Sequence, residues 1–125
     1  MRLHHIGIAT ERIEETKDYC KRIFQIKEET NIIYDPNQNA RLCMLTMDDG
    51  TMIELIEGER VQKFVKKRQY LYHLCYEVKD IDDSIERFRK EKDMVIMRPT
   101  EAVLFGNRKV AFLFTKVGIV ELLEE

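Results

Sequence analysis

Alternation between apolar and polar residues marks a series of short strands along the chain. Residues 3–9 and 71–78 are short, largely apolar segments and are predicted to be strands. On residues 52–56, side chains that alternate between the two faces of a strand place Met52, Glu54 and Ile56 together. Turn sequences such as Asp48-Asp49-Gly50 and Gly106-Asn107 separate further predicted strands. These are expected near residues 28–34, 41–47 and 51–57, and again near 94–98, 109–115 and 118–124.

Two other segments follow the helical period. Apolar residues within 13–23 and within 81–88 return every three or four positions, which places them on one face of a helix. Each predicted helix comes directly after the first strand of its half of the chain. Segment 58–69 has the same spacing and a basic outer side, so a short connecting helix is expected there.

An internal repeat underlies this rhythm. His5-Ile6-Gly7-Ile8 is matched by His73-Leu74-Cys75-Tyr76 at an offset of 68 residues (73 − 5). Ile53-Glu54-Leu55 is matched by Val120-Glu121-Leu122 at an offset of 67 (121 − 54). Since the blocks recur in the same order, they indicate a duplicated module. We therefore predict an α+β fold with two β-α-β-β-β modules in one domain of residues 1–125: module one at 1–57, a connecting segment at 58–69 and module two at 70–125.

Composition excludes several classes of function. A net charge of −2 argues against nucleic acid or an anionic membrane as a partner. No apolar run approaches the length of a membrane span, and the start of the chain lacks the apolar stretch of a secretory signal. The three cysteines are widely spaced without a C-x-x-C pair, which favours reduced thiols. A cytoplasmic protein is expected.

The polar residues of the repeat are the candidate chemistry. Glu54 and Glu121 each lie between apolar neighbours on a strand, and burying an uncompensated polar group costs roughly 2–7 kcal/mol. His5 and His73 occupy equivalent positions on the first strands. Two imidazoles and two carboxylates suit one divalent ion such as Zn, Ni, Co or Mn. Any one of the four alone is more often structural, but their recurrence in both halves favours a shared metal site.

Neighbouring polar residues are assigned differently. His4 points to the opposite face of its strand from His5, and only His5 lies at the offset that matches His73. Glu57 and Glu124 lie on the opposite face from Glu54 and Glu121, near strand ends. We expect His4 to be structural or on the surface, and Glu57 and Glu124 to be exposed to solvent.

Five stretches resemble the vicinal-oxygen-chelate superfamily, and within it the group that includes glyoxalase I and methylmalonyl-CoA epimerase: 3–9 (LHHIGIA), 52–56 (MIELI), 72–78 (YHLCYEV), 107–113 (NRKVAFL) and 118–123 (GIVELL). The resemblance implies the glyoxalase/bleomycin-resistance/dioxygenase fold, an open cup of sheet around one metal ion, and a homodimer. Its metal ligands carry over onto His5, Glu54, His73 and Glu121. The family's Asp-Ser-Pro element is missing, since Glu57-Gly58-Glu59 stands in that region.

The resemblance also implies proton transfer next to a carbonyl, with Glu121 as the base and Glu54 able to share that role. Glyoxalase I-like isomerisation of a hemithioacetal to a thioester is the first expectation, and epimerisation of an acyl-CoA is the alternative. A metal-free protein that sequesters small molecules is the second alternative. A ring-cleaving dioxygenase is disfavoured, because those relatives use two histidines and one glutamate. Arg41, Arg108 and Glu77 are candidates for contact with the thiol adduct or acyl-CoA.

Overall fold

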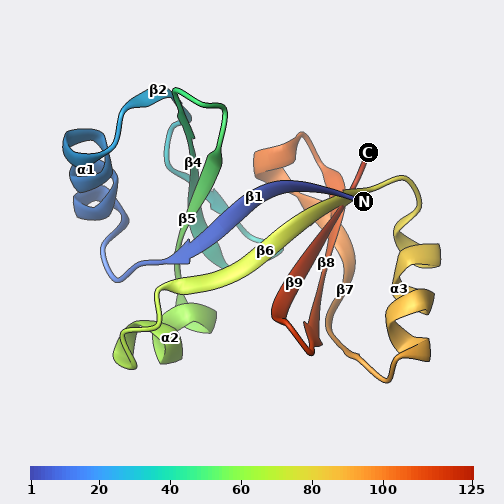
Figure 1. Ribbon diagram of the computed structural model, residues 1–125. Coiled ribbons are helices and arrows are strands. Elements are labelled where there is room, and N and C mark those ends of the chain that lie inside the picture. Colours follow the sequence, from blue (N-terminus) through green and yellow to red (C-terminus); the bar gives the residue numbers. More distant parts are fainter. The chain divides into compact units, whose positions relative to one another are not determined.

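The computed structural model describes all 125 residues and divides into two compact units. The first unit comprises residues 5–72, and the second comprises residues 1–4 together with 73–125. Each unit has a strand, then an α-helix, then further strands (Figure 1). With nine strands and three α-helices in total, the structure confirms the predicted α+β class.

The first unit contains a sheet with the strand order β2-β4-β5-β1, and β3 pairs with β4. β1 and β5 run parallel, whereas β4 is antiparallel to its neighbours. The elements are β1 (Arg2–Ala9), α1 (Ile13–Ile23), β2 (Ile26–Glu29), β3 (Ile33–Asp35), β4 (Ala40–Met47) and β5 (Met52–Gly58), followed by the 3-10 helix η1 (Glu59–Val61) and α2 (Gln62–Lys66). The short connecting helix expected within 58–69 is therefore present.

One strand predicted at residues 28–34 is divided into two. Thr30 lies between β2 and β3 and is hydrogen-bonded to β4. Its N–H donates to the Met44 carbonyl at 2.9 Å. Its hydroxyl accepts from the Met44 N–H at 2.8 Å. A side-chain oxygen thus replaces a backbone carbonyl in the ladder, and the strand is interrupted there.

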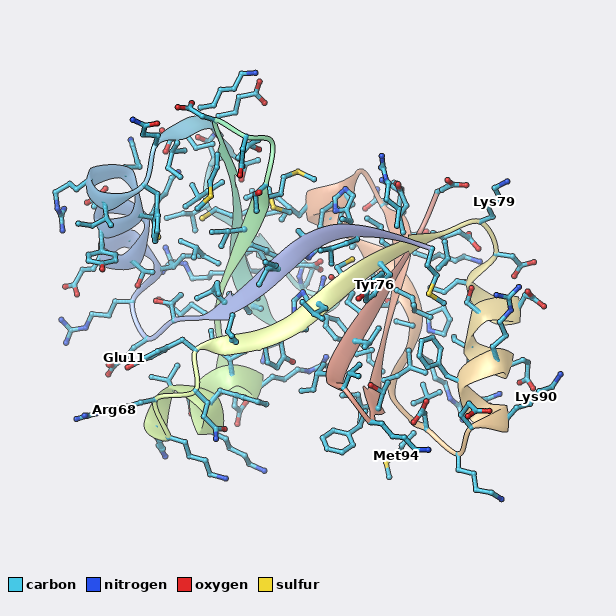
Figure 2. All side chains as sticks on the ribbon, in the orientation of Figure 1. Glu11, Arg68, Tyr76, Lys79, Lys90 and Met94 are labelled. Carbon is cyan, nitrogen blue, oxygen red and sulfur yellow. The ribbon has the colours of Figure 1, made fainter.

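The second unit contains a sheet with the strand order β6-β9-β8-β7, in which β6 and β9 run parallel. Its elements are β6 (Leu71–Val78), α3 (Ile81–Lys90), β7 (Met94–Ala102), the 3-10 helix η2 (Val103–Phe105), β8 (Arg108–Thr115) and β9 (Gly118–Glu124). Lys79 lies two residues before α3, and Lys90 is its last residue (Figure 2). β7 continues past residue 98, where the prediction ended. Its register with β8 shifts between Met97 and Thr100, so Pro99 lies where a missing N–H is tolerated.

A helix covers one face of each sheet and closes a separate core. In the first unit, α1 buries Ile13 and Cys20 against Leu45 and Leu55. In the second unit, α3 buries apolar side chains against β8 and β9; the cluster is Val78, Ile81, Ile85, Ala111, Leu113, Val120 and Leu122. No helix has both the length and the apolar character needed to cross a membrane.

All three cysteines are free and buried, as the absence of close cysteine pairs in the sequence predicts. Burial raises the pKa of the Cys43 thiol to about 11, because the charged thiolate is poorly solvated inside a protein. The thiol therefore stays protonated and unreactive at neutral pH.

The change of offset from 68 to 67 residues within the repeat comes from one turn. In the first unit, Met47 and Thr51 close the β4–β5 turn through a 2.8 Å bond from the Met47 N–H to the Thr51 carbonyl. In the second unit, Thr115 and Gly118 are paired across the β8–β9 turn. Three residues lie between the first pair and two between the second, so strands after this turn match at the shorter offset.

Glu57 and Glu124 are not simply exposed, in contrast to the expectation from sequence. A carboxylate oxygen of Glu57 accepts from the Ile13 N–H at 2.9 Å, at the start of α1. Glu124 does the same for the Ile81 N–H at 2.9 Å, at the start of α3. The first N–H groups of a helix have no partner within the helix, and a negative charge is favoured there. The duplicated glutamates thus join the last strand of each unit to its helix.

Removing the two caps is expected to destabilise the units unequally. In α3 the Asp80 side chain already accepts from the Asp83 N–H, whereas Arg12 gives α1 no side-chain cap. Glu57→Ala should therefore lower the free energy of unfolding by about 1–2 kcal/mol, and Glu124→Ala by less, at the low end of the range for caps. Urea unfolding followed by circular dichroism measures both values. Equal losses, or a greater loss for Glu124→Ala, would contradict this assignment.

Candidate active site

The first unit holds a buried histidine against a buried glutamate on adjacent parallel strands. In the register of β1 and β5, Gly7 is the partner of Glu54, and His5 lies two residues before Gly7 on the same face of β1. His5 Nε2 is 3.5 Å from Glu54 Oε1. His5 is 1% exposed and Glu54 2%, so both predicted site residues of module one meet inside the unit.

The second unit repeats this arrangement. Cys75 on β6 is the partner of Glu121 on β9, and His73 lies two residues before Cys75. His73 Nε2 is 3.1 Å from Glu121 Oε1, and the two residues are 4% and 1% exposed. The ring of Phe112 meets the His73 imidazole edge-on, with ring centroids 5.2 Å apart. Phe112 could not be singled out from the sequence, because its position depends on the register of β8, which spacing alone does not give.

The chemistry of these donors fits a divalent ion. An ionised carboxylate with almost no exposed surface needs a positive or hydrogen-bonding partner, and each glutamate has an imidazole Nε2 beside it. Imidazole nitrogen and carboxylate oxygen are ligands that Zn, Ni, Co and Mn accept. Each unit thus offers one nitrogen and one oxygen donor from matching strand positions, while the apolar surroundings exclude water.

Arg41, predicted to contact substrate, is engaged in ion pairs within the first unit. Its guanidinium contacts Glu14 on α1, and Nη1 also donates to Glu57 Oε1 at 3.1 Å. The hydrogen bonds to Glu14 and then Glu57 raise the pKa of Arg41, and the Arg41 partner lowers the pKa of Glu14. Since Glu57 also caps α1, Arg41 ties the helix to β4 and β5.

Arg108 and Glu77, also predicted to contact substrate, are paired with each other in the second unit. Arg108 Nη2 donates to Glu77 Oε2 at 2.5 Å, and its Nε donates to the Glu124 carbonyl at 2.7 Å. Arg2 Nη2 donates to the other oxygen of Glu77 at 2.5 Å. The hydrogen bond from Arg108, followed by that from Arg2, lowers the pKa of Glu77.

This pairing predicts a pH-dependent contribution to stability. The pKa of Glu77 is lowered in the folded state, so its contribution is fully present above the unfolded value of about 4.3 and disappears as the pH falls through the folded value. Glu77→Gln should cost about 1 kcal/mol or less at pH 7, because Arg2 and Arg108 are partly solvated. Urea unfolding at pH 7 and pH 3 measures it. A deficit of the variant that persists unchanged at pH 3 would contradict the ion-pair explanation.

His4, the rival of His5 in the sequence, makes a different contact. Its ring lies edge-on to Phe105, with centroids 5.6 Å apart, and Phe105 packs against the core formed by Cys75, Ala102, Val110 and Leu123. The side chain thus contacts an aromatic residue of the second unit.

Comparison with known proteins identifies the family. Residues 4–112 match the sequence profile of the Glyoxalase/Bleomycin resistance protein/Dioxygenase superfamily. The chain belongs to this superfamily. Within it, the chain is 28% identical to the mitochondrial methylmalonyl-CoA epimerase of Dictyostelium discoideum, over 99% of this chain and 78% of that protein.

Solved structures of the superfamily share the fold. The methylmalonyl-CoA epimerase of Mycobacterium tuberculosis is 20% identical, with a TM-score of 0.77 over 98% of this chain and 87% of that one. A variant of the Streptomyces coelicolor methylmalonyl-CoA epimerase, in complex with 2-nitronate-propionyl-CoA, is 21% identical, with a TM-score of 0.75 over 100% of this chain and 97% of that one. Glyoxalase I from Zea mays is 17% identical, with a TM-score of 0.65 over 100% of this chain and 43% of that one.

Proposed function

We propose that this superfamily member is an acyl-CoA epimerase of the methylmalonyl-CoA epimerase type, with both units acting as one catalytic domain. The observation that carries the proposal is the duplicated buried pair, His5 with Glu54 and His73 with Glu121. The likeness to the Dictyostelium epimerase favours this activity over the glyoxalase I activity that the sequence argument placed first.

We further propose that the two pairs together hold one divalent ion of Zn, Ni, Co or Mn, with His5, Glu54, His73 and Glu121 as ligands. When bound, such an ion would draw electron density from a thioester carbonyl oxygen and make the neighbouring carbon more acidic. The proposed partners are the small-molecule substrate and a second copy of the chain.

In this proposal the two glutamates move the proton. Glu121 takes the proton from the carbon next to the carbonyl, so that a C–H bond breaks and an O–H bond forms. Glu54, contributed by the other module and protonated at this stage, gives its proton to the opposite face of the same carbon, which inverts the configuration. Glu54 is then ionised and Glu121 protonated, and exchange of protons with water restores the starting state. The buried surroundings of both carboxylates strengthen the interaction of charge with its partners.

Contact with the rest of the substrate is assigned to Arg41, Arg108 and Glu77 as a prediction. Each already has a partner of opposite charge. An anionic group of the substrate would therefore have to replace Glu77 at Arg108, or Glu14 and Glu57 at Arg41, and a surface ion pair of this kind has a low net stability.

Incorporation of deuterium from D2O into methylmalonyl-CoA tests the proposed function. Protein purified without chelators should carry bound metal and catalyse exchange at the carbon between the two carbonyl groups, detected by mass spectrometry. A parallel reaction with methylglyoxal and a small thiol examines the glyoxalase I activity. Metal-loaded protein that is inert toward methylmalonyl-CoA would overturn the proposal, and conversion of the hemithioacetal to a thioester would restore the glyoxalase assignment. Metal-free, inert protein would favour sequestration of small molecules.

A further inference from the structure

The sheet face of the second unit that carries Glu121 is built from three rows of side chains. Alternate residues of β9 point to one side, so this face is shared by Glu121 and its second neighbours. The register with β8 gives three facing pairs along this side: Leu123 with Val110, Glu121 with Phe112, and Ile119 with Phe114.

Burial falls sharply between the second row and the third. Leu123 and Val110 are fully buried, and Glu121 and Phe112 are 1% and 3% exposed. Phe114 is 58% exposed, although it lies only two residues beyond Phe112. Met94, the partner of Phe114 on β7, is 63% exposed and lies at the start of that strand (Figure 2). We call Met94, Phe114 and Ile119 the outer row.

The corresponding row of the first unit is apolar at only one of its three positions, Met52. The register there pairs Thr46 with Met52 on β5 and with Glu28 on β2. Thr46 thus stands where the second unit has Phe114, and Glu28 where it has Met94. Duplication of the module therefore accounts for the matching strands of the two units, but not for the apolar residues Met94 and Phe114 in the outer row of the second. A contiguous exposed apolar row is a surface suited to binding an apolar group.

The outer row lies within reach of a substrate held at Glu121. Ile119 precedes Glu121 by two residues on the same strand face, which corresponds to roughly 7 Å along the strand. The row offers an aromatic ring, a thioether and a branched alkyl group, and none of these side chains forms a conventional hydrogen bond. An amide-containing arm resting there would lose hydrogen bonds to water without replacement, whereas an alkyl chain loses none.

We propose that the outer row binds an alkyl branch on the reacting carbon of the acyl group, so that the protein prefers alkylmalonyl thioesters with a branch longer than methyl. This inference rests on the proposed function and specifies its substrate class. The outer row would then lie beside the alkyl branch of the substrate. Each added methylene group of that branch would be transferred from water to an apolar surface.

A series of acyl-CoA substrates tests the proposal. Methylmalonyl-, ethylmalonyl- and butylmalonyl-CoA have the same acidic carbon and differ only in the alkyl branch. Deuterium exchange catalysed by the metal-loaded protein should show kcat/KM rising two- to fourfold per added methylene group, where about fourfold corresponds to complete burial of one CH2.

Variants that copy the first unit provide the sharper comparison. Phe114→Thr and Met94→Glu introduce the residues that stand at the equivalent positions, Thr46 and Glu28. Each should reduce the ratio of kcat/KM for butylmalonyl-CoA to that for methylmalonyl-CoA to near one. Val117→Thr is the matched control, because Val117 is 74% exposed and lies in the β8–β9 turn outside the outer row. It should keep the wild-type ratio.

Failure of this proposal can be told apart from failure of the proposed function. Exchange into methylmalonyl-CoA without a gain for longer branches would overturn the outer row as an alkyl site and leave the epimerase assignment intact. No exchange with any member of the series would overturn both. Sedimentation velocity covers the remaining case: if Phe114→Thr converts a dimer to a monomer and leaves the substrate ratio unchanged, the row is a contact between copies and the proposal is wrong.

Discussion

Glu121→Gln is expected to block epimerisation, with a fall in rate of roughly 10²–10⁴, the usual contribution of a positioned acid–base group. The amide has nearly the same shape as the carboxylate and keeps an oxygen that His73 Nε2 can approach, now 3.1 Å from Glu121 Oε1. It does not accept a proton. The variant should therefore fold and bind metal while losing proton transfer, measured as inversion of one purified epimer of methylmalonyl-CoA.

Glu54→Gln separates the two halves of the reaction. If each carboxylate serves one face of the carbon, Glu121→Gln and Glu54→Gln should stop deuterium exchange with opposite epimers while both stop inversion. Glu124→Gln is the matched control: it changes a neighbouring glutamate of β9 that caps α3 and should leave the rate of inversion within about twofold of wild type, since its contribution is that of a helix cap. Loss of exchange with the same epimer in both variants would contradict a two-base mechanism.

The histidine–glutamate pairs were predictable because two independent patterns agree on them. Strand periodicity puts Glu54 and Glu121 among apolar neighbours, and the repeat offset selects His5 rather than His4. In the structure, each of these histidines lies beside the glutamate of its own module. That the two pairs share one ion stays a prediction.

Other features depend on information that spacing does not carry. The helix caps by Glu57 and Glu124 require a strand end to approach a helix start 44 and 43 residues away in the sequence. The continuation of β7 through Pro99 depends on a register shift, and the division of the strand at Thr30 depends on one hydroxyl contact with Met44. Each is decided by tertiary packing, which overrides local preference.

The sequence pattern also does not distinguish glyoxalase I activity from epimerase activity. Glyoxalase I and epimerase activity both remove a proton next to a carbonyl, and they differ in where the proton returns and in what holds the rest of the substrate. The four proposed ligand residues carry no signal about that difference. The two modules differ at residues outside the proposed ligand set: Phe114 in the second module stands at the position of Thr46 in the first. This equivalence can be recognised only from the strand register.

Metal binding is expected to depend on both modules. His5→Gln and His73→Gln should each lower the metal content of the purified protein well below one ion per chain, measured by elemental analysis, because each removes one nitrogen donor of the proposed set. An ion present at 100 times its dissociation constant stabilises the folded state by about 2.7 kcal/mol. A chelator should therefore lower the melting temperature of the wild type, and should have little further effect on either variant.

His4→Gln is the matched control for the metal prediction, because His4 precedes His5 on the same strand, contacts Phe105 and is not one of the four proposed ligands. It should keep both the metal and the response to chelator. Comparing each protein with and without chelator removes the separate cost of changing a buried side chain, since that cost is present in both measurements. A loss of metal in His4→Gln equal to that in His5→Gln, or a wild-type melting temperature that chelator leaves unchanged, would show that the imidazoles serve the core rather than a cation.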